Sequence, residues 1–265
     1  MFLERMSYPD VEKYLSRKDT VVIPVGSLEN HGKHMPLGTD TIIPNRIAEL
    51  LEERFPDVVI APTLPYGATD DLRGFAGTVS LGVEGLRVVL QTICDQLFEY
   101  GFRRFIILNG HGGNVKSIEQ VGIKVFERGG YLAIVNWWLI AGQIRPEWKG
   151  GHGGAEETAG VMAVDPTLIH SEYLTLGECI RNDISDELPS TSWTSVEFKG
   201  GMVTVPRHVN SITDNGWLAH GMGSDVPTNA TREWGMEMLD AMADYVRDFI
   251  GALERAPLPK ADGAK

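Results

Sequence analysis

The sequence predicts an α/β fold in which helices cover both faces of a mainly parallel sheet. Between residues 20 and 138, short apolar runs suited to buried strands alternate with longer segments of helical spacing. Such alternation is typical of βα units, whose strands pair in parallel and whose helices cover the sheet. The length of 265 residues and the hydrophobic content of 43% suit one domain with a sizeable core.

The first half of this fold is predicted from apolar runs and from the residues that end them. A turn with a proline starts a short helix over residues 11–15. The apolar run at 21–25 predicts a buried strand, which a glycine ends. Helical spacing follows at 42–51, and the apolar stretch at 58–65, just beyond a proline, predicts the second strand.

The later elements continue the alternation and end in one closing helix. In chain order, they are a helix at 85–98, a strand at 105–108, a helix at 117–128, a strand at 131–138, a hairpin or irregular arm around 200–210, and a helix at 230–252. We expect a single domain over residues 1–255, followed by a polar tail at residues 256–265.

Composition and charge exclude several functional classes. The net charge of −12 disfavours nucleic acid and anionic membranes as partners. No run of 18 apolar residues occurs and the N-terminus lacks the pattern of a signal peptide, so we expect a cytoplasmic protein. Cys94 and Cys179 lie in no CxxC motif, which excludes a disulfide framework and a thiolate zinc site. Cys94 is expected in the core.

Three polar residues follow the first predicted strand. Glu29 and His31 share a face only where the chain is extended, and Asp40 can fold back toward them because glycine and proline let the loop turn sharply. Carboxylates and an imidazole that converge at the end of a strand form a metal-ligand set. The alternative is a solvated polar loop with a surface histidine.

A glycine-flanked histidine follows the strand predicted at 105–108. The stretch NGHGGN places His111 at the carboxyl end of that strand, where ligands gather in open parallel sheets. The glycines would let the backbone approach a metal or a substrate closely. Glycine-rich turns also bind phosphate. The spacing matches neither G-x-G-x-x-G nor G-x-x-x-x-G-K-[ST], however, which argues against a nucleotide site.

A second glycine-flanked histidine lies in the stretch WKGGHGGAEET. His152 and Glu156 are four positions apart and would share a helix face, while Glu157 would lie about a quarter-turn away. The alternative is an ordinary helix start, where acidic residues are favoured by the helix dipole. Spacing alone leaves both interpretations open.

Together, the three motifs resemble those of the creatininase (creatinine amidohydrolase) family. GSLENHGKHMPLGTD is similar to the family pattern G-S-x-E-x-H-G-x-x-L-P-x-x-T-D, with Met35 in place of leucine. LNGHGGN is similar to N-G-H-G-G-N, and HGGAEETA resembles H-A-G-x-x-E-T-S. The resemblance covers about residues 21–166 and continues weakly to residue 235. It implies a hydrolase with two divalent metal ions and a three-layer α/β/α core.

The resemblance also implies a set of metal ligands, with Asp40 as the bridge between two ions. In creatininase proper, the fifth ligand is a glutamate two residues after the third-ligand histidine, where this chain has Gly113. Glu157 is the expected replacement, and Glu156 is the alternative. The other implied ligands are Glu29, His31 and His111.

Two further residues match creatininase in their spacing. The resemblance implies that His152 is the acid that protonates the leaving group and that Trp148 stacks on a planar substrate. The stretch TDDLRGFAGT departs from the family pattern S-x-E-H-x-x-F-P-G-T, because Leu72 replaces the histidine. This departure puts creatinine itself in doubt as the substrate. The residues that we expect to contact the substrate are Tyr66, Asp70, Arg73 and Trp138.

The implied chemistry is attack of a metal-bridging hydroxide on a carbonyl carbon, with Zn²⁺ or Mn²⁺ as the two ions. Hydrolysis of a C–N bond in a small cyclic or linear amide is expected first. Ring opening of a cyclic diketone, such as an oxidised inositol, is the alternative, because Asp70, Asp71 and Arg73 would suit a hydroxyl-rich ring. Trimming of a short peptide precursor ranks behind both, and a non-catalytic metal-binding protein ranks last. The family is commonly hexameric, so a homo-oligomer is expected.

Overall fold

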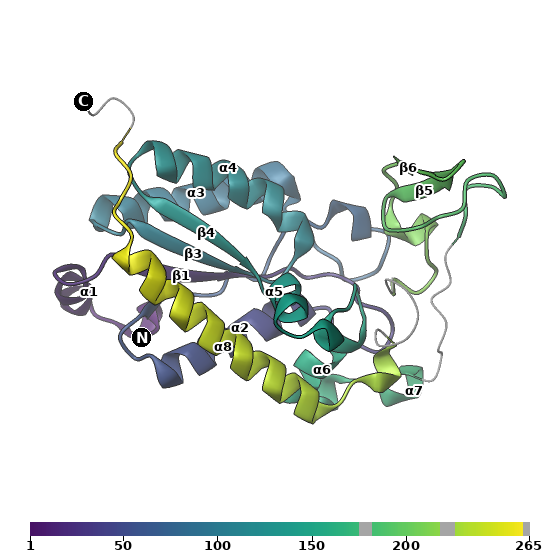
Figure 1. Cartoon of the computed structure of the whole chain (residues 1–265), viewed down its shortest axis with the longest axis horizontal. Coiled ribbons are helices and arrows are strands. Elements are labelled where there is room, and N and C mark those ends of the chain that lie inside the picture. Colours follow the sequence, from purple (N-terminus) through teal and green to yellow (C-terminus); the bar gives the residue numbers. More distant parts are fainter. Residues whose placement is uncertain (175–181, 218–225, 262–265) are drawn as a thin grey trace.

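The computed structural model describes residues 1–174, 182–217 and 226–261, and a parallel four-stranded sheet lies at its centre (Figure 1). The strand order is β2-β1-β3-β4. Val25 pairs with Asn109 and Asn109 pairs with Asn136, so the carboxyl ends of three strands are level at one edge. The strands are β1 (Thr20–Val25), β2 (Val59–Ile60), β3 (Arg104–Asn109) and β4 (Tyr131–Asn136).

Helices cover both faces of this sheet, which confirms the predicted three-layer α/β/α architecture (Figure 1). One layer contains α3 and α4, and the other contains α2 and α8. The described α-helices are α1 (Tyr8–Leu15), α2 (Thr39–Arg54), α3 (Gly82–Tyr100), α4 (Val115–Glu127), α5 (Trp137–Ile144), α6 (Ala155–Val164), α7 (Ser171–Leu174) and α8 (Arg232–Arg255).

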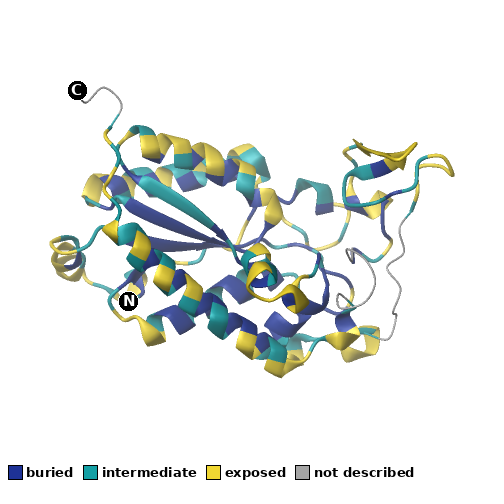
Figure 2. Cartoon of the chain, viewed as in Figure 1, coloured by how far each residue is buried: buried dark blue, intermediate teal, exposed yellow. Residues whose placement is uncertain are grey.

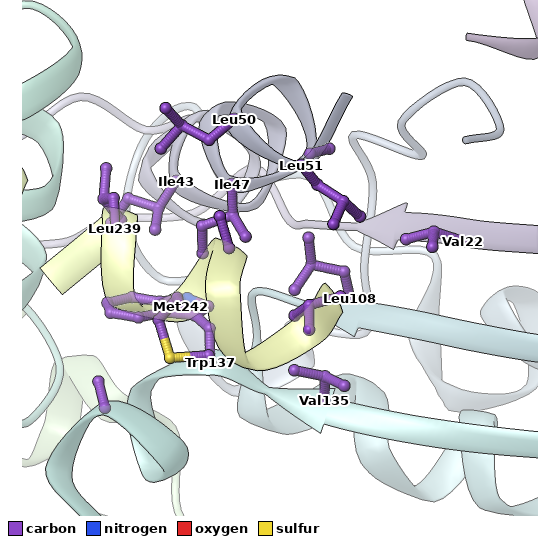
Figure 3. Packing of buried hydrophobic residues seen from close by; sticks show 14 of the residues in the cluster. Val22, Ile43, Ile47, Leu50, Leu51, Leu108, Val135, Trp137, Leu239 and Met242 are labelled. Carbon is purple, nitrogen blue, oxygen red and sulfur yellow. The ribbon is translucent and has the colours of Figure 1, made fainter. Parts of the chain in front are cut away.

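Alternate side chains of the strands fill two separate cores. Val22 and Leu108 point toward α2 and α8 (Figure 3), whereas Val21 and Phe105 pack with residues of α3 and α4. All residues of β1 and β3 are buried (Figure 2), as expected for central parallel strands covered on both faces. Cys94 is buried in the second core, as predicted, and Cys179 lies outside the described residues.

Most predicted elements are present, with shifted boundaries. The helix predicted at 42–51 begins three residues earlier, at Thr39, so Asp40 lies in the first turn of α2 rather than in the preceding loop. A negative charge is favoured at this end of a helix. The strand predicted at 58–65 is only two residues long. The predicted hairpin is present as β5 (Ser195–Phe198) and β6 (Gly201–Thr204), which pair antiparallel.

The expectation that Trp137 and Trp138 end a strand was wrong. β4 ends at Asn136, and both tryptophans begin α5. Trp137 is buried in the same core as Met242 (Figure 3), while Trp138 is only partly buried against it. The apolar run continued past the end of the strand because a buried helix start needs the same residues as a buried strand.

We predict that Trp137→Ala lowers the free energy of unfolding by about 3–5 kcal/mol, because it leaves a large cavity in a closed core. Trp138→Ala is the matched control and should lower the free energy of unfolding less, because Trp138 is only partly buried against this core. Denaturant unfolding of both variants measures the difference. Equal losses would contradict this description of the packing.

None of the helices in the described part of the chain is both long enough and apolar enough to cross a membrane.

Candidate metal centre

Donor side chains from three segments meet at the carboxyl edge of the sheet. The first segment follows β1, where the Glu29 N–H donates to the Leu37 carbonyl and so closes the loop that returns the chain to Asp40. The second follows β3, and the third runs from His152, before α6, to Glu157 in the first turn of α6. Among the described residues, three groups of donors have ligand atoms within 4.8 Å of one another: Glu29, Asp40 and His111; His31, Asp40 and Glu157; and Glu29, His31 and His152.

Asp40 lies between the two histidines that the sequence singled out. Its Oδ1 is 2.9 Å from Nε2 of His31, and its Oδ2 is 3.1 Å from Nδ1 of His111. The Ser27 hydroxyl donates to Oδ2 at 2.8 Å and fixes the carboxylate. Each oxygen of Asp40 therefore faces a different imidazole, which is the arrangement that a bridging ligand requires.

A backbone carbonyl orients each of these imidazoles. The Nδ1 atom of His31 lies 3.1 Å from the Glu29 carbonyl oxygen, and the Nε2 atom of His111 lies 3.1 Å from the Ala68 carbonyl oxygen. A carbonyl can only accept, so these nitrogens carry the protons. The opposite nitrogen of each ring is left facing the carboxylates. Metal-ligating histidines are commonly held in this way.

The structure places Glu157, rather than Glu156, in this cluster. The Glu157 Oε2 atom accepts a hydrogen bond from the Gly153 N–H at 2.7 Å and lies 3.8 Å from Nε2 of His31. Glu156 points instead toward Gly150, where its carboxylate fills the space that a β-carbon would need. The shared helix face expected for His152 and Glu156 was wrong, because α6 begins only at Ala155.

The electrostatics of the cluster fit a bound cation. Burial lowers the pKa of His31, but the carboxylates of Asp40 and Glu157 outweigh it and raise that pKa to about 10. Burial raises the pKa of Glu157 to about 8. Protons thus balance the buried carboxylates when no metal is present, and divalent ions would balance them instead. Oε2 of Glu29 is buried and has no hydrogen-bond donor among the described residues. A bound cation would balance its negative charge as well.

Gly113 stands where creatininase proper has a glutamate, and the structure leaves no room for a side chain at this position. A β-carbon at this position would lie 2.2 Å from the Ala68 carbonyl oxygen and 2.5 Å from Nε2 of His111. A side chain here would therefore break the hydrogen bond that orients His111. Glu157 reaches the cluster from α6, with its Oε2 atom 3.8 Å from Nε2 of His31.

Gly110 allows β3 to approach α2 closely. A β-carbon at Gly110 would lie 1.9 Å from the Asp40 carbonyl oxygen and 2.8 Å from Cγ of Pro44. We predict that Gly110→Ala displaces Asp40, costs about 1–3 kcal/mol of stability and weakens metal binding about tenfold. Thermal unfolding and elemental analysis would measure both effects. Gly85→Ala, a helical position with ordinary space, is the control. Unchanged metal content in Gly110→Ala would contradict this prediction.

Sequence reasoning missed two asparagines that join the loops. Asn109 donates to the carbonyl of His111 at 2.7 Å, and Asn114 donates to the carbonyl of Gly26 at 3.0 Å. Asn114 also accepts from the N–H of Ala68 at 2.8 Å. Both asparagines stand in the NGHGGN motif, so the signal was present in the sequence. Their role depends on contacts with distant segments.

A cavity of about 930 Å³ opens beside the cluster. Its lining includes the donor residues Asp40, His111, His152 and Glu157, and also Glu156. Apolar and polar side chains from several segments complete it: Asp71, Trp138, Leu139, Gln143, Lys149, Trp193 and Thr194. Many of the remaining lining positions are glycines, which leave the backbone accessible.

Of the four residues predicted to contact the substrate, the structure places one in the described cavity lining. Trp138 lines the cavity, but the described lining does not include Tyr66, Asp70 or Arg73. Asp70 accepts from the Ser80 hydroxyl and pairs with Arg73, so its neighbour Asp71 faces the cavity instead. Trp148 is not in the lining either.

Trp148 is 3% exposed and packs in the core of the α2 and α8 layer, with the Arg145 guanidinium 4.5 Å above its ring. The structure therefore does not support Trp148 as a surface on which the substrate stacks. Trp193, which sequence reasoning missed, is the tryptophan beside His152. Their ring centroids are 4.8 Å apart and the rings meet edge to face. No short-range motif marks Trp193.

Comparison with known proteins identifies similar chains. The family model Creatininase (creatinine amidohydrolase) matches residues 4–250. The mycofactocin precursor peptide peptidase of Mycobacterium tuberculosis is 30% identical over 266 residues, covering 94% of this chain and 89% of that protein. The 3-dehydro-scyllo-inosose hydrolase of Thermotoga maritima is 25% identical over 294 residues, covering 99% and 88%. A solved structure described as "Creatininase Mn" covers 96% of this chain and 99% of its own, with a TM-score of 0.71 and 23% identity, which shows a common fold.

Proposed function

The chain belongs to the creatininase family of hydrolases, and from this membership we propose that it hydrolyses a C–N amide bond with two divalent metal ions. The observation that carries the proposal is the position of Asp40. Its two oxygens face His31 and His111 separately, at 2.9 and 3.1 Å. A carboxylate in this position can be shared by two ions, as in the two-metal hydrolases.

The donors divide into two sets around Asp40. We assign Glu29 and His111 to one ion, and His31 and Glu157 to the other, with Asp40 in both sets. Nitrogen and oxygen donors without thiolates suit Zn²⁺ or Mn²⁺. When bound, the ions would polarise the substrate carbonyl and activate water near neutral pH.

His152 is the proposed proton carrier. It lines the cavity, and its buried Nε2 atom has no hydrogen-bond partner within the described ranges. Burial lowers the pKa of His152 well below its ordinary value, which favours the neutral ring. A neutral imidazole can take a proton from the attacking water and deliver it to the leaving nitrogen.

The size of the cavity favours a linear amide over a single small ring. Its volume of about 930 Å³ is near the upper end of the range of about 300–1,000 Å³ that is usual for small-molecule sites. The relative named as a precursor peptide peptidase points the same way. A short peptide is therefore the first substrate class to test.

Ring opening of a cyclic diketone is the second candidate, because the inosose hydrolase of Thermotoga maritima aligns over 99% of this chain. The three polar residues expected to bind a hydroxyl-rich ring support this second candidate only in part. Asp71 lines the cavity, whereas Asp70 and Arg73 pair with each other outside the described lining.

The test is turnover of a substrate panel by protein loaded with Mn²⁺ or Zn²⁺. The panel contains short linear peptides, creatinine and other cyclic amides, and a cyclic 1,3-diketone, with products identified by mass spectrometry. We expect cleavage of the linear amides to be fastest. Turnover of the diketone alone would replace amide hydrolysis by C–C hydrolysis. Metal binding without turnover of any class would favour a non-catalytic metal-binding protein.

We also propose self-association. β4 is an outer strand of the described sheet and has one edge without a strand partner. Light scattering after size-exclusion chromatography would measure the mass in solution.

A further inference from the structure

The segment between α7 and α8 contributes one wall of the cavity. Within residues 182–217 of this segment, Trp193 comes just before β5 and lines the cavity together with Thr194. The hairpin that follows is mostly exposed (Figure 2), and Figure 1 shows it standing apart from the three layers. Trp193 is thus the point at which this segment meets the proposed active site.

Two contacts fix the indole of Trp193. Its Nε1–H donates to Oδ2 of Asp71 at 2.5 Å, across 122 positions of sequence. Its ring meets the imidazole of His152 edge to face, at a centroid distance of 4.8 Å and an angle of 72°. The imidazole of His152 also lies beside the imidazole of His31, with the two ring centroids 4.4 Å apart. His152 is therefore in contact with both rings.

A small separate core anchors this arrangement. Leu72, next to Asp71 in the turn Asp70–Leu72, is fully buried with Val209 and Ile212, and Trp193 packs against the same cluster. The same turn region approaches the segment so closely that a β-carbon at Gly74 would lie 2.2 Å from the Asn210 side chain. Leu72 stands where the family pattern has a histidine, so an apolar anchor replaces a polar residue here.

We propose that Trp193, held by Asp71, is a positioning residue for His152. This inference rests on the proposed function, because it assumes that His152 transfers the proton. The indole limits the rotation of the imidazole away from His31, and Asp71 keeps the indole in place through a charge-assisted hydrogen bond. Without the pair, His152 would sample orientations that do not align with the leaving group, and precise alignment is worth large factors in rate.

The first test reads the geometry without any catalysis. The protein has six tryptophans, and labelling their indole nitrogens with ¹⁵N gives one N–H signal for each. Trp193→Phe assigns the signal of Trp193 by its disappearance. We expect Asp71→Ala to shift this signal and speed its exchange with water, whereas Asp71→Asn, which keeps an acceptor oxygen, should change it less. A Trp193 signal that is the same in wild type and Asp71→Ala would overturn the proposal.

The second test is kinetic and uses the panel substrate that wild type cleaves fastest. We expect Trp193→Phe and Asp71→Ala each to lower kcat about tenfold, with KM changed less than about threefold and metal content unchanged. The double variant should be no worse than either single variant, because both remove the same hydrogen bond. Asp71→Asn should restore most of the activity. Additive losses, or a fall in metal content, would overturn a positioning role.

Trp234→Phe is the matched control, since the Trp234 indole nitrogen has no hydrogen-bond acceptor in the described structure and the residue is outside the described cavity lining. It should leave kcat unchanged. Failure of the two proposals is distinguishable. If wild type cleaves nothing on the panel, the proposed function fails while the indole signal still reports on the contact between Trp193 and Asp71.

Discussion

Asp40→Asn should remove most of the bound metal and lower the rate of hydrolysis at least about 1,000-fold, equivalent to about 4 kcal/mol of transition-state stabilisation. Asp40 is 2% exposed and faces both His31 and His111, so the substitution weakens both proposed ion sites at once. An amide keeps the shape of the carboxylate but cannot supply its charge. Elemental analysis and turnover of the fastest panel substrate measure the two losses.

Asp57→Asn provides the control for Asp40→Asn. Asp57 is a surface carboxylate paired with Arg17 and Lys18, and its loss should leave metal content and turnover unchanged. Removal of the metal from wild type by a chelator should abolish activity, and Mn²⁺ or Zn²⁺ should restore it. The same addition should not restore Asp40→Asn. Wild-type metal content in Asp40→Asn would refute the assignment of Asp40 as the shared ligand.

His152→Gln is expected to lower kcat about 100- to 10,000-fold while the metal content stays at the wild-type level. Glutamine can fill part of the space of the imidazole, but it cannot carry a proton between water and the leaving nitrogen. His152 lies in the cavity lining, next to His31, as the proposed proton transfer requires. Steady-state kinetics and elemental analysis separate the proton-transfer role from a metal-binding role.

Metal binding is the alternative role of His152, because Glu29, His31 and His152 also form a group with donor atoms within 4.8 Å of one another. Loss of metal in His152→Gln would make His152 a ligand instead of the proton carrier. His170→Gln, which changes an exposed histidine away from the cavity, is the control and should behave as wild type.

Several features of the candidate site could be predicted from short-range pattern. The alternation of apolar runs and helical segments predicted the parallel sheet, and the positions of Glu29 and His111 just after two strands predicted where donors would gather. The first prediction depends on periodicity, which neighbouring residues in the sequence specify. The second depends on the general rule that ligands gather at the carboxyl ends of parallel strands.

Other features depended on contacts between segments far apart in the chain. Spacing could not choose Glu157 over Glu156, because the choice follows from where α6 begins and from the Gly153 N–H that holds the carboxylate. A tryptophan that stacks on the substrate was expected at Trp148, which the structure buries in the core, and the tryptophan found beside His152 is Trp193.

The sequence by itself thus determined the layers of the fold and the chemical type of the donor groups. Tertiary structure alone decided which of two adjacent glutamates joins the donor cluster, which tryptophan lies beside His152, and which of two adjacent aspartates lines the cavity. The physical reason is that a side chain in a loop has no periodic partner to direct it. Its direction is fixed by packing and hydrogen bonds such as the one between Trp193 and Asp71, which joins residues 122 positions apart.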